Sequence, residues 1–156
     1  MDNKTFFRRV VNWLIPLVVG GLGALLSGGM GNYRAINQPP LSPPGWIFPL
    51  VWSVLYVLMG EAAFRIQTSG RDAAQVKKAM RIYIIQLAVN LIWPIVFFKG
   101  QNYLGAFLVI VALWVAIFIT LRRFSQIDET AGDLLVPYLL WVTFAAYLNL
   151  GVFLLN

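Results

Sequence analysis

The residues of this sequence that could do chemistry are aromatic rings and side-chain amides, repeated at helical spacing. One run places them three and four positions apart, as Tyr83, Gln86, Asn90, Trp93 and Phe97. That spacing puts all five on one face of an α-helix. Unpaired amides are costly in an apolar environment, so we expect this face to point toward other helices or a cavity. Rings that stack and amides that hydrogen-bond are suited to holding a ligand.

Two other runs carry similar stripes. One presents Trp52, Leu55, Tyr56 and Met59 on a single helical face, and the other presents Tyr138, Trp141, Ala145 and Asn149. The stripes have two interpretations. They could be ordinary helix packing with Asn and Gln as interhelical hydrogen-bond partners, which periodicity alone favours. They could also line a cavity, where the small Ala145 would leave room beside a large tryptophan.

Close helix packing normally selects small residues, and these occur elsewhere in the sequence. The first apolar run holds two rows of small residues four positions apart, and a later run holds a third: Gly20, Ala24 and Gly28; Gly23, Ser27 and Gly31; Ala112, Ala116 and Thr120. We expect those helices to approach a neighbour closely, within a bundle or across a homodimer. The bulky aromatic stripes therefore favour the cavity.

Composition excludes most familiar catalysis. Cysteine and histidine are both absent, which removes thiolate nucleophiles, the usual zinc and copper sites and the commonest general base. Glu61 is the only carboxylate inside an apolar run, so we assign no catalytic residue and no metal site. Glu61 and Arg65 stand at i and i+4, and we expect them to pair near the membrane interface. The alternative role for Glu61 is a coupling residue in a transporter.

These residues lie on a chain with the composition of a membrane protein. Of its 156 residues, 60% are hydrophobic and 12% are charged, which is far from a soluble domain. A bilayer core of ~30 Å needs about 20 helical residues. We therefore expect one all-α transmembrane domain, a bundle of five helices at about 9–30, 44–66, 80–98, 103–122 and 134–155. The first apolar run exceeds the signal-peptide core of roughly 7 to 15 residues, so we assign it as a helix.

The basic residues indicate orientation rather than nucleic-acid binding. With five spans, one face carries Lys4, Arg8, Arg9, Arg65, Arg71, Lys77, Lys78, Arg81, Arg122 and Arg123, and the other carries only Arg34 and Lys99. This asymmetry predicts a cytoplasmic N-terminus and a C-terminus outside. An anionic-lipid or nucleic-acid patch is the less favoured interpretation, because the basic residues form no continuous stripe.

The links between the expected helices carry their own signals. Four prolines force a stiff, extended approach to the second helix: Pro39, Pro40, Pro43 and Pro44. We expect Ser42 as that helix's N-cap, with Pro43 or Pro44 at its first position. Before the fifth helix, Thr130 and Asp133 have capping-box spacing.

Three segments closely resemble the translocator protein family, whose members are also called tryptophan-rich sensory proteins or peripheral-type benzodiazepine receptors. They are PPLSPPGWIFPLVWSVLYVLMG at 39–60, QLAVNLIWPIVFF at 86–98 and VPYLLWVTFAAYLN at 136–149. The similarity runs over nearly the whole chain, and the segments come in the family's order. Two family tryptophans are replaced here, by Leu41 and Asn32, which suggests a different ligand preference.

The resemblance implies a bundle of five helices, often dimeric, that binds tetrapyrroles such as protoporphyrin IX and, in some members, sterols or benzodiazepine-like drugs. Its pocket would open toward the long first link. By motif, the implied ligand-binding residues are Tyr33 in the lid, Trp52, Tyr56, Asn90, Trp93, Trp141 and Ala145. No basic residue follows Tyr147, so we do not predict sterol binding.

The expected function is that of a receptor or sensor in a bacterial-type cell membrane, with a tetrapyrrole as ligand rather than cofactor. The usual haem ligands are absent, which favours a porphyrin without metal. The expected partners are membrane lipids and a second copy of the chain, and no nucleic acid. Three alternatives stay open: light-dependent porphyrin breakdown through Trp52 and Trp141, a porphyrin or sterol transporter, and a purely structural membrane protein.

Overall fold

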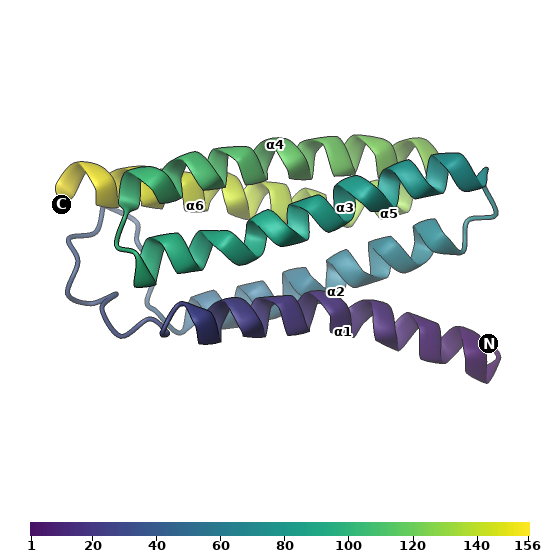
Figure 1. The fold of residues 1–156 in the computed structure, drawn as a ribbon, viewed down its shortest axis with the longest axis horizontal. Helices are drawn as coiled ribbons and strands as arrows, with labels where there is room; N and C mark the ends of the chain where they lie inside the picture. Colours follow the sequence, from purple (N-terminus) through teal and green to yellow (C-terminus); the bar gives the residue numbers. More distant parts are fainter.

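The computed structural model describes all residues, 1–156, and contains only helices. They are α1 (Asn3–Leu26), α2 (Ile47–Gln67), α3 (Ala73–Pro94) with its π-helical continuation η1 (Ile95–Lys99), α4 (Tyr103–Ile127), α5 (Glu129–Asp133) and α6 (Val136–Leu155). Five helical stretches are long and apolar enough to cross a membrane: 3–26, 47–67, 73–99, 103–127 and 129–155. The chain termini lie at opposite ends of one elongated bundle (Figure 1). The predicted five-helix all-α membrane fold is confirmed.

The first helix begins and ends earlier than the expected range of 9–30. Its start is capped by Asp2, whose Oδ1 accepts a hydrogen bond of 2.7 Å from the Thr5 N–H. Its end comes before Gly28 and Gly29, whose φ angles of 78° and 82° are left-handed and therefore incompatible with helix. The expectation that Gly28 and Gly31 extend the small-residue rows of this helix was wrong, because both lie in the link.

The second helix begins at Ile47, after the prolines rather than on them. Trp46 occupies the N-cap position and makes no side-chain cap. Ser42 was wrongly expected there: its Oγ donates instead to the carbonyl of Pro39 at 2.7 Å. The prolines exclude helix from the residues before them, so Ser42 closes a turn inside the link. The link from 27 to 46 is therefore a non-helical segment held by internal hydrogen bonds.

The expected capping box before the last helix was also wrong. Asp128 is the cap, and its Oδ1 accepts from the backbone N–H groups of Thr130 (2.9 Å) and Ala131 (3.3 Å). The result is the short helix α5, which breaks before α6 starts at Val136. Asp128 also binds Arg65 of α2 through an ion pair of 3.0 Å. One carboxylate thus caps α5 and ties this end of the chain to α2.

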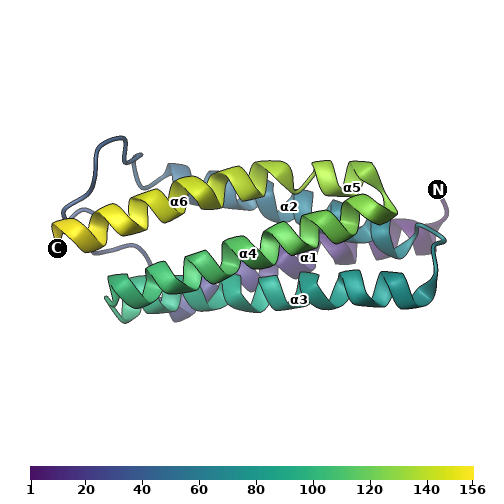
Figure 2. The ribbon, with the colours of Figure 1, turned by 90° about the horizontal axis from the view of Figure 1, so that it is seen from above.

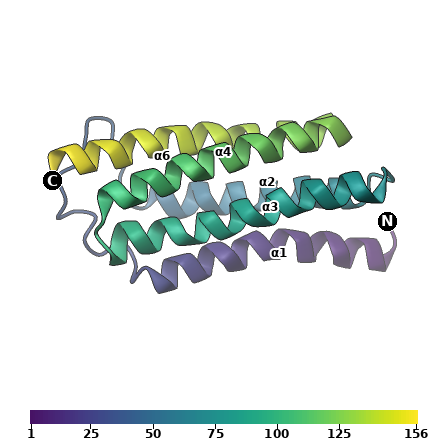
Figure 3. The ribbon, with the colours of Figure 1, turned by 45° about the horizontal axis from the view of Figure 1, so that its top comes forward.

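The helices surround a core built from the predicted stripes. α1 packs on α2 and α3, α3 packs on α4, and α4 packs on α6; Figure 2 shows α4 crossing alongside α3, and Figure 3 shows α2 and α3 between α1 and the α4/α6 pair. The buried members of the stripes are Leu55, Met59, Tyr83, Gln86, Asn90, Phe97, Tyr138, Ala145 and Asn149. The prediction that these faces point inward is confirmed.

Small residues allow close contact inside this bundle. A Cβ added at Gly23 would lie 3.2 Å from the Pro94 side chain, and one added at Gly60 would lie 2.6 Å from Cα of Trp13. On α4, Ala116 and Thr120 are buried while Ala112 is exposed. Most of the predicted small residues that do lie in helices therefore pack against other helices of the same chain.

Candidate binding cavity

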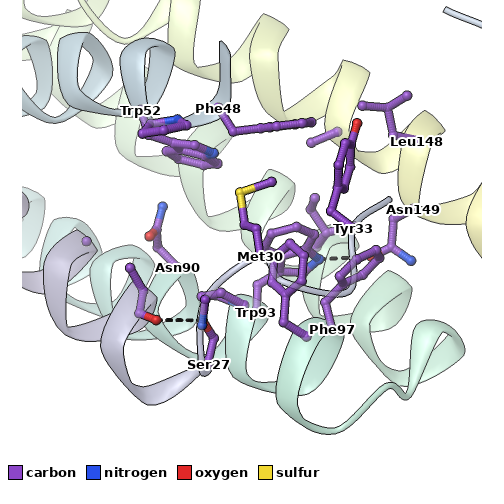
Figure 4. A pocket seen from close by; sticks show the side chains of 18 of the residues that line it. Ser27, Met30, Tyr33, Phe48, Trp52, Asn90, Trp93, Phe97, Leu148 and Asn149 are labelled. Atoms are coloured by element: carbon purple, nitrogen blue, oxygen red, sulfur yellow. Dashed lines mark hydrogen bonds between the residues drawn. The ribbon is translucent and has the colours of Figure 1, made fainter. Parts of the chain in front are cut away.

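A cavity of about 490 Å³ lies between the helices at the end that carries the 27–46 link. Its wall takes residues from all five long helices and from that link. Figure 4 shows Trp52 and Phe48 of α2 across the space from Trp93 and Phe97 of the α3–η1 helix. Small-molecule sites have volumes of about 300–1,000 Å³, so the cavity is of ligand size.

Six of the seven predicted site residues line this cavity: Tyr33, Trp52, Tyr56, Asn90, Trp93 and Ala145. Trp141 does not. Its ring lies 5.9 Å from the ring of Phe48, which does line the cavity. Trp141 instead lines an apolar groove between α2 and α6, and its Nε1 is buried without a hydrogen-bond partner. Indole rings of two helices, rather than three, therefore face the cavity.

A chain of hydrogen bonds fixes the inner wall. The Tyr56 hydroxyl donates to Oδ1 of Asn90 at 2.9 Å, and Nδ2 of Asn90 donates to the Tyr138 hydroxyl at 2.9 Å. The Tyr138 hydroxyl donates in turn to Oε1 of Gln86 at 2.7 Å. Three helices, α2, α3 and α6, meet in this network. Both interpretations of the stripes thus apply, because the amides join helices while the rings beside them line a cavity.

The two cavity tryptophans are held by their neighbours. Trp52 stacks on Tyr56 at 5.5 Å between ring centroids. Trp93 stacks on Phe97 at 5.0 Å, and its Nε1 donates to Oδ1 of Asn149 at 2.9 Å. Rings held in this way lose little further freedom when a ligand stacks on them. The aromatic wall of the cavity is therefore held in place by contacts within the chain.

The link forms the wall of the cavity at one end. The Tyr33 hydroxyl donates to the Pro43 carbonyl at 2.7 Å, and the Tyr33 ring meets Phe48 edge to face at 5.3 Å. Burial raises the pKa of Tyr33 above its usual value of 10.0, so its hydroxyl keeps its proton further into the alkaline range. Tyr147 of α6 donates to the Pro40 carbonyl at 2.8 Å. The link is thus fastened both to itself and to α6.

Sequence reasoning missed several wall residues. Phe48 lies inside the proline-rich segment, so its aromatic ring beside Trp52 was a usable signal. Met30 and Gln38 belong to the link, where no periodicity indicates direction, and Ile110 and Leu113 belong to the uniformly apolar α4. No pattern in the sequence could have identified Met30 and Gln38, or Ile110 and Leu113, as wall residues.

Glu61 lies outside the cavity wall, and its expected partner was wrong. Its carboxylate forms an ion pair with Arg9 of α1 and accepts a hydrogen bond of 2.9 Å from Nε1 of Trp13. Arg65 turns instead to Asp128. The close contact at Gly60 brings α1 beside Glu61, so Arg9 lies within ion-pair distance of its carboxylate. Glu61 therefore joins two helices at the end opposite the 27–46 link.

Five membrane-spanning helices around an uncharged aromatic cavity define an integral membrane protein with an internal pocket. A model of the TspO/MBR family matches residues 13–155. The chain belongs to the TspO/MBR family, as its three motifs predicted.

Three relatives illustrate the similarity. "Tryptophan-rich protein TspO" of Chlorobaculum tepidum is 39% identical over 156 residues, which cover 99% of each chain. "Tryptophan-rich sensory protein" of Cereibacter sphaeroides is 40% identical over 80% of this chain and 76% of its own. "Translocator protein" of Bos taurus is 35% identical over 87% of this chain and 82% of its own. The similarity therefore spans the helices that form the cavity.

Proposed function

We propose that this protein is a membrane receptor or sensor that binds planar hydrophobic ligands, chiefly tetrapyrroles such as protoporphyrin IX without metal. The observation that carries the proposal is the cavity of about 490 Å³ with Trp52 and Trp93 in its wall and no charged residue among those lining it. The names of two relatives, a tryptophan-rich sensory protein and a translocator protein, agree with a role in ligand recognition or passage.

The energetics favour a flat macrocycle. Removing apolar surface from water contributes roughly 25 cal/mol per Å² before ordering costs, and a porphyrin offers two broad faces. Aromatic rings in offset or edge contact add about 0.5–1.5 kcal/mol per pair. The stacked pairs Trp52–Tyr56 and Trp93–Phe97 present such rings on different helices. A ligand between them would contact indoles from two directions.

Binding, rather than proton-coupled transport, is the function that the side chains support. Glu61 is the only carboxylate within α2, and it is engaged by Arg9 and Trp13 outside the cavity wall. A coupling carboxylate would need contact with the path of the ligand.

Fluorescence quenching of the purified protein in lipid tests the proposal. Protoporphyrin IX should quench the tryptophan emission, and Trp52→Leu or Trp93→Leu should raise Kd about five- to thirty-fold, because each removes roughly 1–2 kcal/mol of ring contact. The matched control is Trp114→Leu. Trp114 lies outside the wall, donates to Thr143 and stacks on Phe118, so its loss should leave Kd unchanged. Unchanged affinity in both cavity variants would refute the pocket assignment.

We also propose that the N-terminal end faces the cytoplasm of a bacterial-type cell and that the protein forms homodimers. The excess of basic residues at that end supports the orientation, and the family resemblance supports the dimer. Because the chain has no cysteine, single cysteines placed at Ser69 and Ala35 would report their sides through an impermeant thiol reagent. If the reagent labels Ala35→Cys but not Ser69→Cys from the cytoplasmic side, the proposed orientation is wrong. If no single-cysteine variant forms cross-linked pairs in lipid, the proposed dimer is wrong.

A further inference from the structure

The cavity has no group that could neutralise an anion. None of its lining residues carries a charge, and its polar members are amides, hydroxyls and two indoles. Burying an ionised carboxylate without a counter-charge is strongly unfavourable. A tetrapyrrole with two carboxylates on one edge, as in protoporphyrin IX, must therefore leave that edge outside the apolar space.

The end of the bundle beside the cavity is suited to receive that edge. Two cations lie at this end, Arg34 in the 27–46 link and Lys99 at the last position of η1. Figure 1 shows that link and the turn between η1 and α4 at the same end of the bundle. Arg34 follows the cavity residue Tyr33 and Lys99 follows the cavity residue Phe98. Both cations are exposed, and neither belongs to the chain's two ion pairs. Each is therefore free to meet an anion beside the wall.

The distribution of acidic side chains makes this end distinctive. All six lie at the other end, in the cap of α1, the far half of α2, the link before α3, or α5 and its cap: Asp2, Glu61, Asp72, Asp128, Glu129 and Asp133. No acidic side chain competes with a ligand for Arg34 or Lys99. Arg34 and Lys99 are therefore cations with no acidic side chain at their end of the bundle, whereas the basic residues of the opposite end lie among all six acidic ones, and Arg9 and Arg65 are paired with two of them.

We propose that Arg34 and Lys99 form an anion subsite at the mouth of the cavity, which selects amphipathic dicarboxylates by holding their acidic edge while the apolar body occupies the aromatic space. This inference rests on the proposed function and specifies the ligand class and its direction in the site. The ring stacks beside Trp52 and Trp93, and the carboxylates remain near the link.

The test compares protoporphyrin IX with its dimethyl ester, which has the same ring and no charge, in vesicles of neutral phosphatidylcholine. The unaltered protein should bind the diacid more tightly than the ester. Arg34→Gln and Lys99→Gln should each weaken diacid binding about two- to five-fold, the range of an exposed ion pair, and leave ester binding unchanged. Raising the salt concentration should reduce the preference for the diacid, because exposed charges are screened.

Arg71→Gln is the matched control, since Arg71 is an exposed, unpaired cation in a link at the other end. Equal binding of diacid and ester by the unaltered protein, or equal loss for both ligands in the variants, would overturn the subsite while leaving the cavity proposal intact. An effect seen only in vesicles with anionic lipid would assign the two cations to headgroups and would also overturn it. Failure of both ligands to bind would instead refute the proposed function.

Discussion

Replacing Gly20 by alanine should disturb the wall of the cavity, which Gly20 lines beside Tyr56. Gly20 of α1 lies against the ring of Tyr56, and an added Cβ would lie 2.6 Å from Cζ and 2.9 Å from Cδ2 of that ring, with Cε2 nearer still. The ring cannot easily move, because it stacks on Trp52 and its hydroxyl donates to Asn90. The substitution must therefore shift α1, displace the ring or break the hydrogen bond.

The size of the effect follows from two opposing terms. Overpacking a tight interior contact costs about 1–3 kcal/mol, whereas alanine in place of glycine inside a helix gains up to about 1 kcal/mol. Gly21 also lines the cavity and provides the matched comparison, since an added Cβ there would meet nothing within 4 Å. We expect Gly21→Ala to be neutral or slightly stabilising, and Gly20→Ala to be less stable than Gly21→Ala by about 1–3 kcal/mol.

The assay is thermal unfolding of both variants in the same lipid or detergent, followed by circular dichroism, together with porphyrin quenching. Gly20→Ala should unfold at lower temperature than Gly21→Ala and should bind more weakly, because Tyr56 lines the cavity. Equal unfolding temperatures and equal affinities for the two variants would show that the contact between α1 and Tyr56 is not as tight as described.

Two further predictions concern the polar contacts between helices. Tyr138→Phe removes a hydroxyl that accepts a hydrogen bond from Asn90 and donates one to Gln86. The free energy of unfolding should fall by about 1–2 kcal/mol, because both buried amides lose a partner. An unchanged unfolding temperature would contradict this. Glu61→Gln should destabilise the protein by about 1–2 kcal/mol, because it leaves Arg9 without its carboxylate partner. Porphyrin affinity should stay unchanged. A variant as stable as the unaltered protein would show that the ion pair contributes nothing to stability.

Helix faces could be predicted from the sequence because they depend on local geometry. A repeat of three and four residues places side chains on one side of a helix whatever the partner, and so Asn90, Trp93 and Tyr138 were predicted to face inward. Helix ends were less accurate. The helix ends at Gly28 and Asp128 depend on which of several competing local hydrogen bonds and φ angles is most stable. Several residues near each end had side chains that could have capped the helix.

Partners across helices could not be predicted for a different reason. Glu61 has a cation four residues away along its own helix, yet it pairs with Arg9, because the close approach at Gly60 brings α1 beside it. Trp141 lies on the same stripe as Ala145, but its ring packs against Phe48 and faces the groove between α2 and α6. A period defines a face, whereas the rotation of neighbouring helices decides what that face meets.

The sequence by itself determined that this is a membrane protein of five helices, that its rings and amides gather on inward faces, and that it has neither histidine nor cysteine. These properties follow from composition, run length and local periodicity, which need no knowledge of distant contacts. Only the tertiary structure decided that the inward faces leave a cavity, that Trp52 and Trp93 line it while Trp141 does not, and that Asn90 is bonded to two tyrosines. Those outcomes depend on how large and small residues from different helices fit together, and no single segment carries that information.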